Sequence, residues 1–250
     1  MTYLKGMAVS IIIPTLNEAA ALPATLKVID QLAPGPQEII IVDAGSADDT
    51  VKLAKQSGVT VIENAPRGRA AQMNLGAARA TGDRLCFLHA DTEVPHDFIA
   101  LTEDVLSNQQ TALAGFISVM RGKGGVRRVT TAHNFIKTWY APMLFRPISF
   151  LRGCRLLFGD QVIICRRADF EAIGGWSTEQ TIMEEADLCL RMVRAGRGRV
   201  RQVPRKVWSS DRRVAEWGFW RANMTFLYVG LMWGFGARPE QLARHYEDIR

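Results

Sequence analysis

The fold class follows from the stretch Val9-Ser-Ile-Ile-Ile-Pro-Thr-Leu-Asn-Glu18, in which a short apolar run gives way at once to polar residues. A second stretch, Glu38-Ile-Ile-Ile-Val-Asp-Ala-Gly-Ser46, has the same arrangement further along the chain. Both runs are rich in β-branched residues and are too short for typical helices, so they predict strands that are buried on both faces. Such strands are typical of parallel sheets covered by helices.

Strand-like and helix-like segments alternate through the first half of the chain. Further strands are expected at 59–62, 84–88, 112–120 and 161–165, and helices at 18–31, 69–80 and 185–195. This order predicts an α/β protein with a mainly parallel central sheet flanked by helices. Loops are expected at 121–125 and 146–159, and the aromatic-rich residues 206–250 predict a C-terminal helical extension.

Composition excludes several classes of protein. The chain has 250 residues, of which 48% are hydrophobic and 22% charged, which argues against disordered and fibrous proteins. Its four cysteines form no C-x-x-C pair, so we expect no disulfide framework or structural zinc, and a reducing cytoplasm. The late uncharged stretch 222–237 has sixteen residues, fewer than the roughly 20 needed to span a membrane.

Charge is distributed unevenly between the two halves. Residues 1–120 carry 8 Lys/Arg and 13 Asp/Glu, a net charge of −5, whereas residues 121–250 carry 23 and 12, a net charge of +11. This asymmetry predicts an acidic site in the first half and a basic surface in the second, facing phosphate, nucleic acid or an anionic membrane. The basic residues are scattered and no nucleic-acid motif is present, so we do not expect nucleic acid as the partner.

Polar residues follow three of the expected strands, where ligands bind in open parallel sheets. The residues at these strand ends, most of them polar or acidic, are Pro14, Asn17 and Glu18 after the first strand, Asp43 after the second, and His89, Ala90 and Asp91 after the fourth. The sequence has neither G-x-x-x-x-G-K-[ST] nor G-x-G-x-x-G, so a nucleotide bound here would need a metal ion at its diphosphate. Asp91 suits Mg²⁺ or Mn²⁺, although an Asp after a strand is equally often a turn residue.

Two arginines, Arg67 and Arg69, flank Gly68 at the expected start of a helix. Guanidinium groups and free helix N–H groups at one point make an anion site suited to a diphosphate. The alternative is a solvated surface turn.

Five motifs together resemble family 2 glycosyltransferases. They are Ser10-Ile-Ile-Ile-Pro-Thr-Leu-Asn-Glu18, Ile41-Val-Asp-Ala-Gly-Ser-Ala-Asp-Asp-Thr50, His89-Ala-Asp-Thr92, Gly174-Gly-Trp176 and Glu184-Glu-Ala-Asp-Leu-Cys-Leu-Arg191. The resemblance implies a GT-A domain over 1–205, with a nucleotide-sugar half at 1–120 and an acceptor half at 121–205. Gly68-Arg-Ala-Ala-Gln-Met-Asn74 and the His-Ala-Asp variant of the D-x-D motif are similar to a bacterial subgroup.

The resemblance also implies residue roles on the donor side. Pro14, Asn17 and Glu18 would line the base and ribose pocket, and Asp43 would accept a hydrogen bond from the base. Asp91 would match the second acid of the D-x-D motif and bind Mn²⁺ or Mg²⁺, while His89 replaces the first acid, with Ala90 between them. The donor would be a UDP- or GDP-linked sugar, and transfer to a hydroxyl acceptor would proceed with inversion.

The catalytic base is expected among Glu184, Glu185 and Asp187. Thr181 and Glu184 have the spacing of a capping box, and Asp187 lies four residues before Arg191, the spacing of an ordinary ion pair. Glu185 occupies the position at which the family places an Asp base. The resemblance therefore favours Glu185 as the base, with Asp187 as the second candidate.

Acceptor contacts are expected from Asp160, Gln161, Gly175 and Trp176. Trp176 follows two glycines and could stack on a sugar, but a lone Trp is more often part of the core.

The C-terminal segment combines aromatic residues with Arg212, Arg213 and Arg221. This combination fits a peripheral contact with the inner face of the membrane and a lipid-linked acceptor, and equally fits packing on the catalytic domain or a homodimer. Two other functions are weighed: a sugar-phosphate nucleotidyltransferase, whose basic glycine-rich stretch after the first strand is absent, and a non-catalytic nucleotide-sugar-binding relative, which the departures at His89 and Glu185 leave open.

Overall fold

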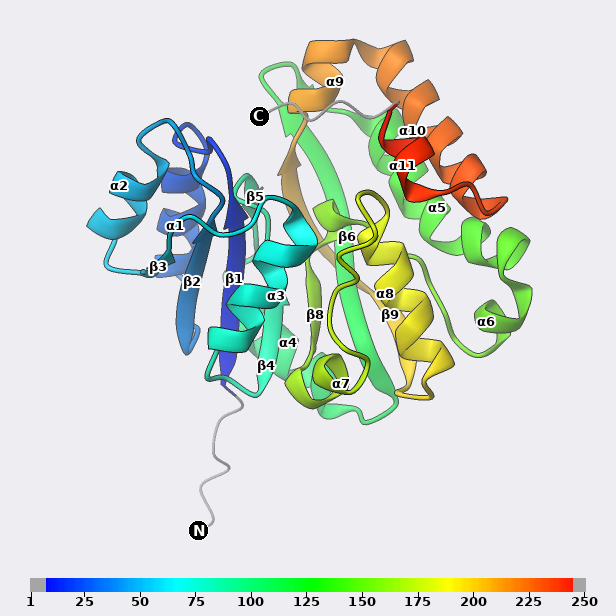
Figure 1. Cartoon of the computed structure of the whole chain (residues 1–250), viewed down its shortest axis with the longest axis horizontal. Helices are drawn as coiled ribbons and strands as arrows, with labels where there is room; N and C mark the ends of the chain where they lie inside the picture. Colours follow the sequence, from blue (N-terminus) through cyan, green and yellow to red (C-terminus); the bar gives the residue numbers. More distant parts are fainter. Residues whose placement is uncertain (1–7, 245–250) are drawn as a thin grey trace.

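The computed structural model describes residues 8–244, which form a curled mixed sheet flanked by helices (Figure 1). Within these residues nine strands pair in the order β3-β2-β1-β4-β8-β6-β9-β5, with β7 on β6. The strands are β1 (Val9–Thr15), β2 (Glu38–Asp43), β3 (Thr60–Ile62), β4 (Arg84–Phe87), β5 (Thr92–Glu93), β6 (Thr111–Gly122), β7 (Gly125–Val126), β8 (Ile163–Arg166) and β9 (Arg199–Ser210). The helices are α1 (Leu22–Asp30), α2 (Thr50–Gln56), α3 (Arg69–Arg79), α4 (Phe98–Ser107), α5 (Arg128–Phe145), α6 (Pro147–Leu151), α7 (Arg167–Ala172), α8 (Glu184–Arg194), α9 (Arg212–Trp217), α10 (Phe219–Gly234) and α11 (Pro239–Ala243), with a 3₁₀ turn at Gly159–Gln161.

The first half is the predicted parallel sheet, because β3, β2, β1 and β4 all run in the same direction. Alternate residues of β1 enter two different cores. Ile12 packs in the cluster that contains Met73 of α3, whereas Ile11 and Ile13 pack in the cluster that contains Leu26 of α1. The continuous apolar run of β1 is therefore explained by helices on both faces of the sheet.

The second half departs from the expected pattern. Strand β8 runs antiparallel to both β4 and β6, and β9 lies parallel to β6 for most of its length. Because β9 continues to Ser210, the central sheet extends past residue 205, at which the domain was expected to end. The expected loops at 121–125 and 146–159 contain the hairpin β6–β7 and helix α6, respectively.

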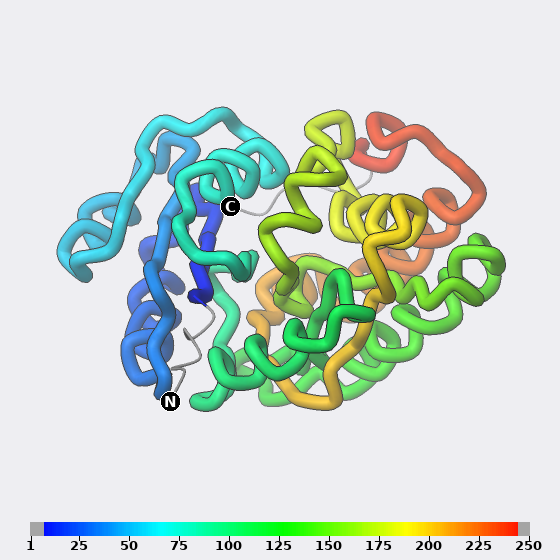
Figure 2. Tube along the Cα trace, turned by 90° about the horizontal axis from the view of Figure 1, so that it is seen from below, coloured from blue at the N-terminus to red at the C-terminus, as the bar shows by residue number. Residues whose placement is uncertain are grey.

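Helices α5, α6 and α10 lie together at the end of the molecule opposite β2 and β3 (Figures 1 and 2). Helix α5 packs against both α6 and α10. In residues 8–244, no helix has the combination of length and apolar character that a membrane span requires.

Candidate active site

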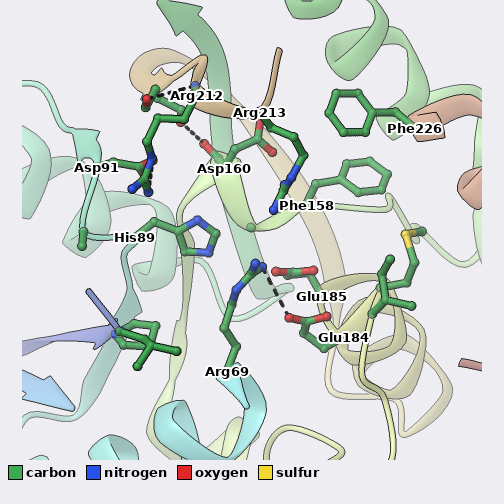
Figure 3. Close-up of a pocket in the computed structure, with 18 of the residues that line it drawn as sticks. Arg69, His89, Asp91, Phe158, Asp160, Glu184, Glu185, Arg212, Arg213 and Phe226 are labelled. Carbon is green, nitrogen blue, oxygen red and sulfur yellow. Dashed lines mark hydrogen bonds and ion pairs between the residues drawn. The ribbon is translucent and has the colours of Figure 1, made fainter. Parts of the chain in front are cut away.

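A cavity of about 440 Å³ opens where the two halves of the sheet meet (Figure 3). Its walls come from the end of β1, the start of α3, the residues after β4, the segment before β8, the start of α8 and the end of β9. Of the residues predicted from the sequence, the following line it: Pro14, Glu18, Arg67, Arg69, His89, Ala90, Asp91, Asp160 and Glu185. The strand ends thus bring together side chains that are distant in the sequence, as expected for a parallel sheet.

On the donor side, Asp91 is paired with Arg212, a residue that follows β9. The Nη2 atom of Arg212 lies 2.9 Å from Asp91 Oδ2. The two terminal nitrogens of Arg212, Nη1 and Nη2, lie 2.9 and 3.0 Å from the two carboxylate oxygens of Glu18. One guanidinium group therefore neutralises two acids that the sequence analysis had placed in the donor site. Arg212 had been considered only as part of a membrane or packing surface.

Asp91 and Glu18 carry carboxylates, the type of ligand that hard divalent metals such as Mg²⁺ and Mn²⁺ prefer. Among residues 8–244 no group of three or more His, Cys, Asp or Glu side chains is arranged to hold a metal ion. Mg²⁺ and Mn²⁺, however, often bind through one or two carboxylates together with water and substrate phosphates. Asp91 at the cavity wall can supply such a carboxylate, provided that Arg212 exchanges partners.

Arg67 and Arg69 lie at the start of α3, as predicted. Gly68 immediately precedes the helix and has a φ of 112°, a conformation that favours glycine. Arg69 Nη1 lies 3.6 Å from Glu184 Oε1, so this arginine also connects α3 to α8. The cation and the helix N-terminus thus lie side by side at the cavity wall, an arrangement suited to binding an anion.

Glu185 lies in the first turn of α8 and is only 6% exposed. Burial raises its pKa to about 8, the adjacent carboxylate of Glu184 acts in the same direction, and the cation of Arg69 acts against both. A carboxyl group with a pKa near neutrality is well suited to accept a proton during a reaction.

Gly159 lies between the first turn of α8 and the residues that follow β4. A Cβ atom at this position would collide with Glu185 Oε1 and would lie 2.6 Å from the His89 ring. Figure 3 shows His89 and Glu185 projecting into the cavity from opposite sides. Only a residue without a side chain allows both groups to lie so close to the backbone at position 159.

The sequence analysis missed a second cation, Lys137 of α5. Its Nζ atom lies 3.6 Å from the centre of the Phe158 ring, and burial lowers its pKa to about 8, partly offset by the acids Asp160 and Glu185. Asn134, one helical turn earlier, donates a 2.9 Å hydrogen bond to Asp160 Oδ2. The spacing of Asn134 and Lys137, which places both on one helix face, was the available signal.

The family model "Glycosyl transferase family 2" matches residues 10–173, more than half of the chain. The chain belongs to glycosyl transferase family 2. It is 30% identical to a PGL/p-HBAD biosynthesis glycosyltransferase of Mycobacterium tuberculosis over 73% of this chain and 68% of that protein. It is 26% identical to a pre-mycofactocin glycosyltransferase of the same species over 82% of this chain and 43% of that protein.

Solved structures share the fold of this glycosyltransferase. The mannosyltransferase PcManGT from Pyrobaculum calidifontis, solved with GDP-Man and Mn²⁺, superposes with a TM-score of 0.69 at 18% identity, covering 97% of this chain and 65% of that one. Glucosyl-3-phosphoglycerate synthase from Mycobacterium tuberculosis, solved with Mn²⁺, UDP-Glc and phosphoglyceric acid, gives 0.60 at 23% identity, covering 93% and 81%. At these identities the likeness establishes the GT-A fold. The chain spans about two thirds of the mannosyltransferase and less than half of the mycofactocin relative.

Two predicted donor residues of the glycosyltransferase lie outside the cavity lining. Asn17 accepts a 2.8 Å hydrogen bond from the backbone N–H of Ala47. Asp43 is 1% exposed and accepts hydrogen bonds from Thr15, Gly45 and Ser46. In this structure both side chains hold the loops around the cavity rather than facing it.

Another residue missed from the sequence, Gln72 of α3, does line the cavity. Its Nε2 donates to the carbonyl oxygens of Thr15 and Val42, so it ties together the ends of β1 and β2. Its buried Oε1 has no hydrogen-bond partner in residues 8–244 and remains available as an acceptor.

Three residues predicted as acceptor contacts of the glycosyltransferase, Gln161, Gly175 and Trp176, lie outside the cavity lining. Trp176 is 2% exposed and packs edge-on against Phe87 with 5.0 Å between ring centroids, so it belongs to the core as the alternative held. Gly175 lies beside Phe170, and Gln161 is fully buried, where it donates to Thr138. Apolar packing and internal hydrogen bonds occupy all three positions.

The candidates for the base also separate in the structure. Asp187 does not line the cavity and forms a 2.6 Å ion pair with Arg191, as the helical spacing suggested. The expected capping box is wrong, because α8 starts at Glu184 after Met183 in the left-handed region, with no side-chain cap. Glu184 and Glu185 are therefore both at the cavity, and Glu184 pairs with Arg69.

Proposed function

We propose that this glycosyltransferase moves a sugar from a UDP- or GDP-linked donor to a hydroxyl acceptor with inversion, using Mn²⁺ or Mg²⁺ at Asp91. The observation that carries the proposal is the arrangement around Gly159. A buried carboxyl group with a raised pKa on α8 faces a cavity wall that carries His89 on the opposite side. Inverting transfer needs a base on the acceptor side and an anion site on the donor side.

Several residues of the chain act on the leaving diphosphate in this scheme. Arg69, the N-terminus of α3 and His89 lie on the donor wall and provide positive charge or hydrogen-bond donors. A bound divalent metal supplies further charge stabilisation there as a Lewis acid. Arg212 then exchanges its contact with Asp91 for one with the diphosphate, while its ion pair with Glu18 keeps the Arg212 side chain near the cavity.

Glu185 takes the proton of the acceptor hydroxyl. Its buried position excludes water, and its carboxyl group lies on the side of Gly159 opposite His89. The hydroxyl oxygen attacks the anomeric carbon as the bond to the diphosphate breaks, so the proton ends on Glu185 and the negative charge on the diphosphate. Attack from the face opposite the leaving group inverts the anomeric configuration.

The acceptor end of the cavity combines apolar and polar groups. Phe158, Phe226 and Val229 form an apolar wall there, next to Lys137 and Asp160. We propose an acceptor with an apolar part as well as its hydroxyl, such as a lipid-linked sugar or alcohol. The free, buried cysteines are compatible with the cytoplasm as its compartment.

Nucleotide binding is tested by thermal unfolding with UDP, GDP, CDP and ADP, each with and without Mn²⁺. A ligand at a hundredfold excess over its Kd stabilises by about 2.7 kcal/mol, which raises Tm by roughly 5–10 °C for a chain of this length. We expect such a shift with UDP or GDP, larger with Mn²⁺, and we expect Asp91→Asn to remove the metal-dependent part. Unchanged Tm values with all four nucleotides at millimolar concentration would contradict the proposal.

The pH dependence of kcat/KM tests the role of Glu185. Because its pKa is raised to about 8, the base is protonated at lower pH, and kcat/KM should rise up to tenfold per pH unit until about pH 8. Glu184→Gln removes the neighbouring negative charge and releases Arg69, so the pKa of Glu185 should fall. The rising part of the pH profile, which we call the acid limb, should then move to lower pH. Arg79→Gln, a change on the far end of α3, should leave the limb in place. If the acid limb does not move in Glu184→Gln, the group that titrates in this limb is not Glu185.

A further inference from the structure

The exposed large apolar side chains gather on one part of the molecule. In residues 8–244 they all lie between Val126 and Leu151 or between Phe219 and Phe235. The most exposed are Leu151 at 83%, Phe235 at 78%, Trp220 at 75% and Ile148 at 68%. Soluble proteins seldom leave so many large apolar groups exposed on neighbouring elements without a partner.

The helices that carry these side chains are neighbours in the fold. Helix α5 packs on α6 and α10, the rings of Phe145 and Phe235 lie 5.2 Å apart, and Arg146 donates a hydrogen bond to the carbonyl oxygen of Gly234. Both views of the fold show α5, α6 and α10 on the same end (Figures 1 and 2). We call this surface the apolar face, defined by the exposed apolar residues of α5, α6 and α10 with Phe235.

The charge of the same segments has a single sign. No Asp or Glu occurs between residues 105 and 159, or between residues 217 and 239. The basic residues there include Arg128, Arg152, Arg221 and Arg238, all exposed. The apolar face is thus bordered by cations, with Glu216 and Glu240 as the acids next along the chain.

We propose that the apolar face docks on the surface of an anionic lipid bilayer. Its aromatic and aliphatic side chains would enter the headgroup region, where Trp and Tyr are favoured, and its arginines would contact lipid phosphates. A second copy of this chain is the less suitable occupant. A two-fold interface would bring the arginines of both copies together with no acid on the face to pair with them.

Docking would place the cavity next to the bilayer, and the role of the cavity as the acceptor site rests on the proposed function. Phe226 and Val229 of α10 and Lys137 of α5 line the acceptor end, so the helices that meet the bilayer also form the wall of the site. An acceptor that resides in the membrane would therefore enter beside the apolar face without first crossing water.

Flotation with vesicles tests the docking directly. We would compare vesicles of phosphatidylcholine with vesicles containing 30% phosphatidylglycerol (about one anionic lipid in three, a composition that attracts basic surfaces). The full chain should float with the anionic vesicles, and the triple variant Ile148→Ser, Leu151→Ser, Trp220→Ser should bind them at least tenfold more weakly. All three side chains are mainly exposed, so Tm should not fall.

A matched pair of charge reversals separates the apolar face from the general charge of the protein. Arg152→Glu with Arg221→Glu should abolish flotation, whereas Lys27→Glu with Arg79→Glu, exposed positions on α1 and α3, should leave it intact. Equal loss in both pairs, or no flotation of the wild type, would overturn the proposal. So would a wild-type dimer, seen by light scattering, that the triple variant converts to a monomer without any binding to vesicles. Because flotation requires no donor or acceptor, its result does not depend on the glycosyltransferase reaction.

Discussion

Glu185→Gln is expected to reduce kcat by about two to four orders of magnitude, the usual contribution of a positioned general base. The amide cannot accept the acceptor hydroxyl's proton, while its shape fits the same buried site. Nucleotide affinity should be unchanged, because Glu185 stands on the acceptor side of Gly159. Stability should be unchanged or higher, since a neutral amide replaces a buried group that carries a like-charged neighbour. Turnover with the identified donor and binding by calorimetry measure the two effects.

The matched control for this substitution is Asp187→Asn, on the same helix. Asp187 is paired with Arg191 outside the cavity. The control variant should therefore have a slightly lower Tm and nearly the same kcat as the wild type. Full activity in Glu185→Gln together with an inactive Asp187→Asn would transfer the role of base to Asp187. Retained activity in both variants would contradict a base on α8 altogether.

Gly159→Ala is expected to reduce kcat/KM at least a hundredfold with little change in Tm. The three atoms nearest to the new methyl group all belong to the outer ends of two side chains, Glu185 and His89, and we expect these side chains to move rather than the backbone. The cost to stability is therefore small, but both groups leave the positions at which they would act. Misplacing reacting groups by about 1 Å can cost a hundredfold in rate.

Gly230→Ala provides the comparison for this second prediction. Gly230 lies within α10, and an added Cβ meets no atom within 4 Å. Alanine there should leave activity unchanged and slightly stabilise the helix. If Gly159→Ala were as active as Gly230→Ala, the approach of His89 and Glu185 would have no role in the reaction.

Much of the fold could be predicted from the sequence because its signals are local. The apolar runs of β1 and β2 are continuous, and the end of β1 is followed by Glu18, which reaches the cavity. Arg69 was placed at a helix start by local signals, and α3 begins there. Glu185 was favoured by the family resemblance, and it lies in the first turn of α8. The family resemblance added the order in which these signals occur.

Strand β9 could not be predicted in this way. Its sequence contains Pro204 and several basic residues, a pattern typical of a loop. It forms a strand because β6 and β5 pair with it on either side, and the register with β6 shifts between Phe116 and Ile117, where Pro204 interrupts the ladder. Pairing with partners distant in the chain overrides local preference.

The sequence by itself determined the parallel half of the sheet, the polar strand ends and the position of Glu185, because these depend on neighbouring residues and on strand direction. Only the tertiary structure decided that Arg212 pairs with Asp91, that Lys137 lines the cavity beside Phe158 and that Trp176 is buried in the core. Each of these depends on packing between segments far apart in the sequence. Such contacts leave no periodic pattern in the chain, since the free energy that places them arises only when the sheet closes around the cavity.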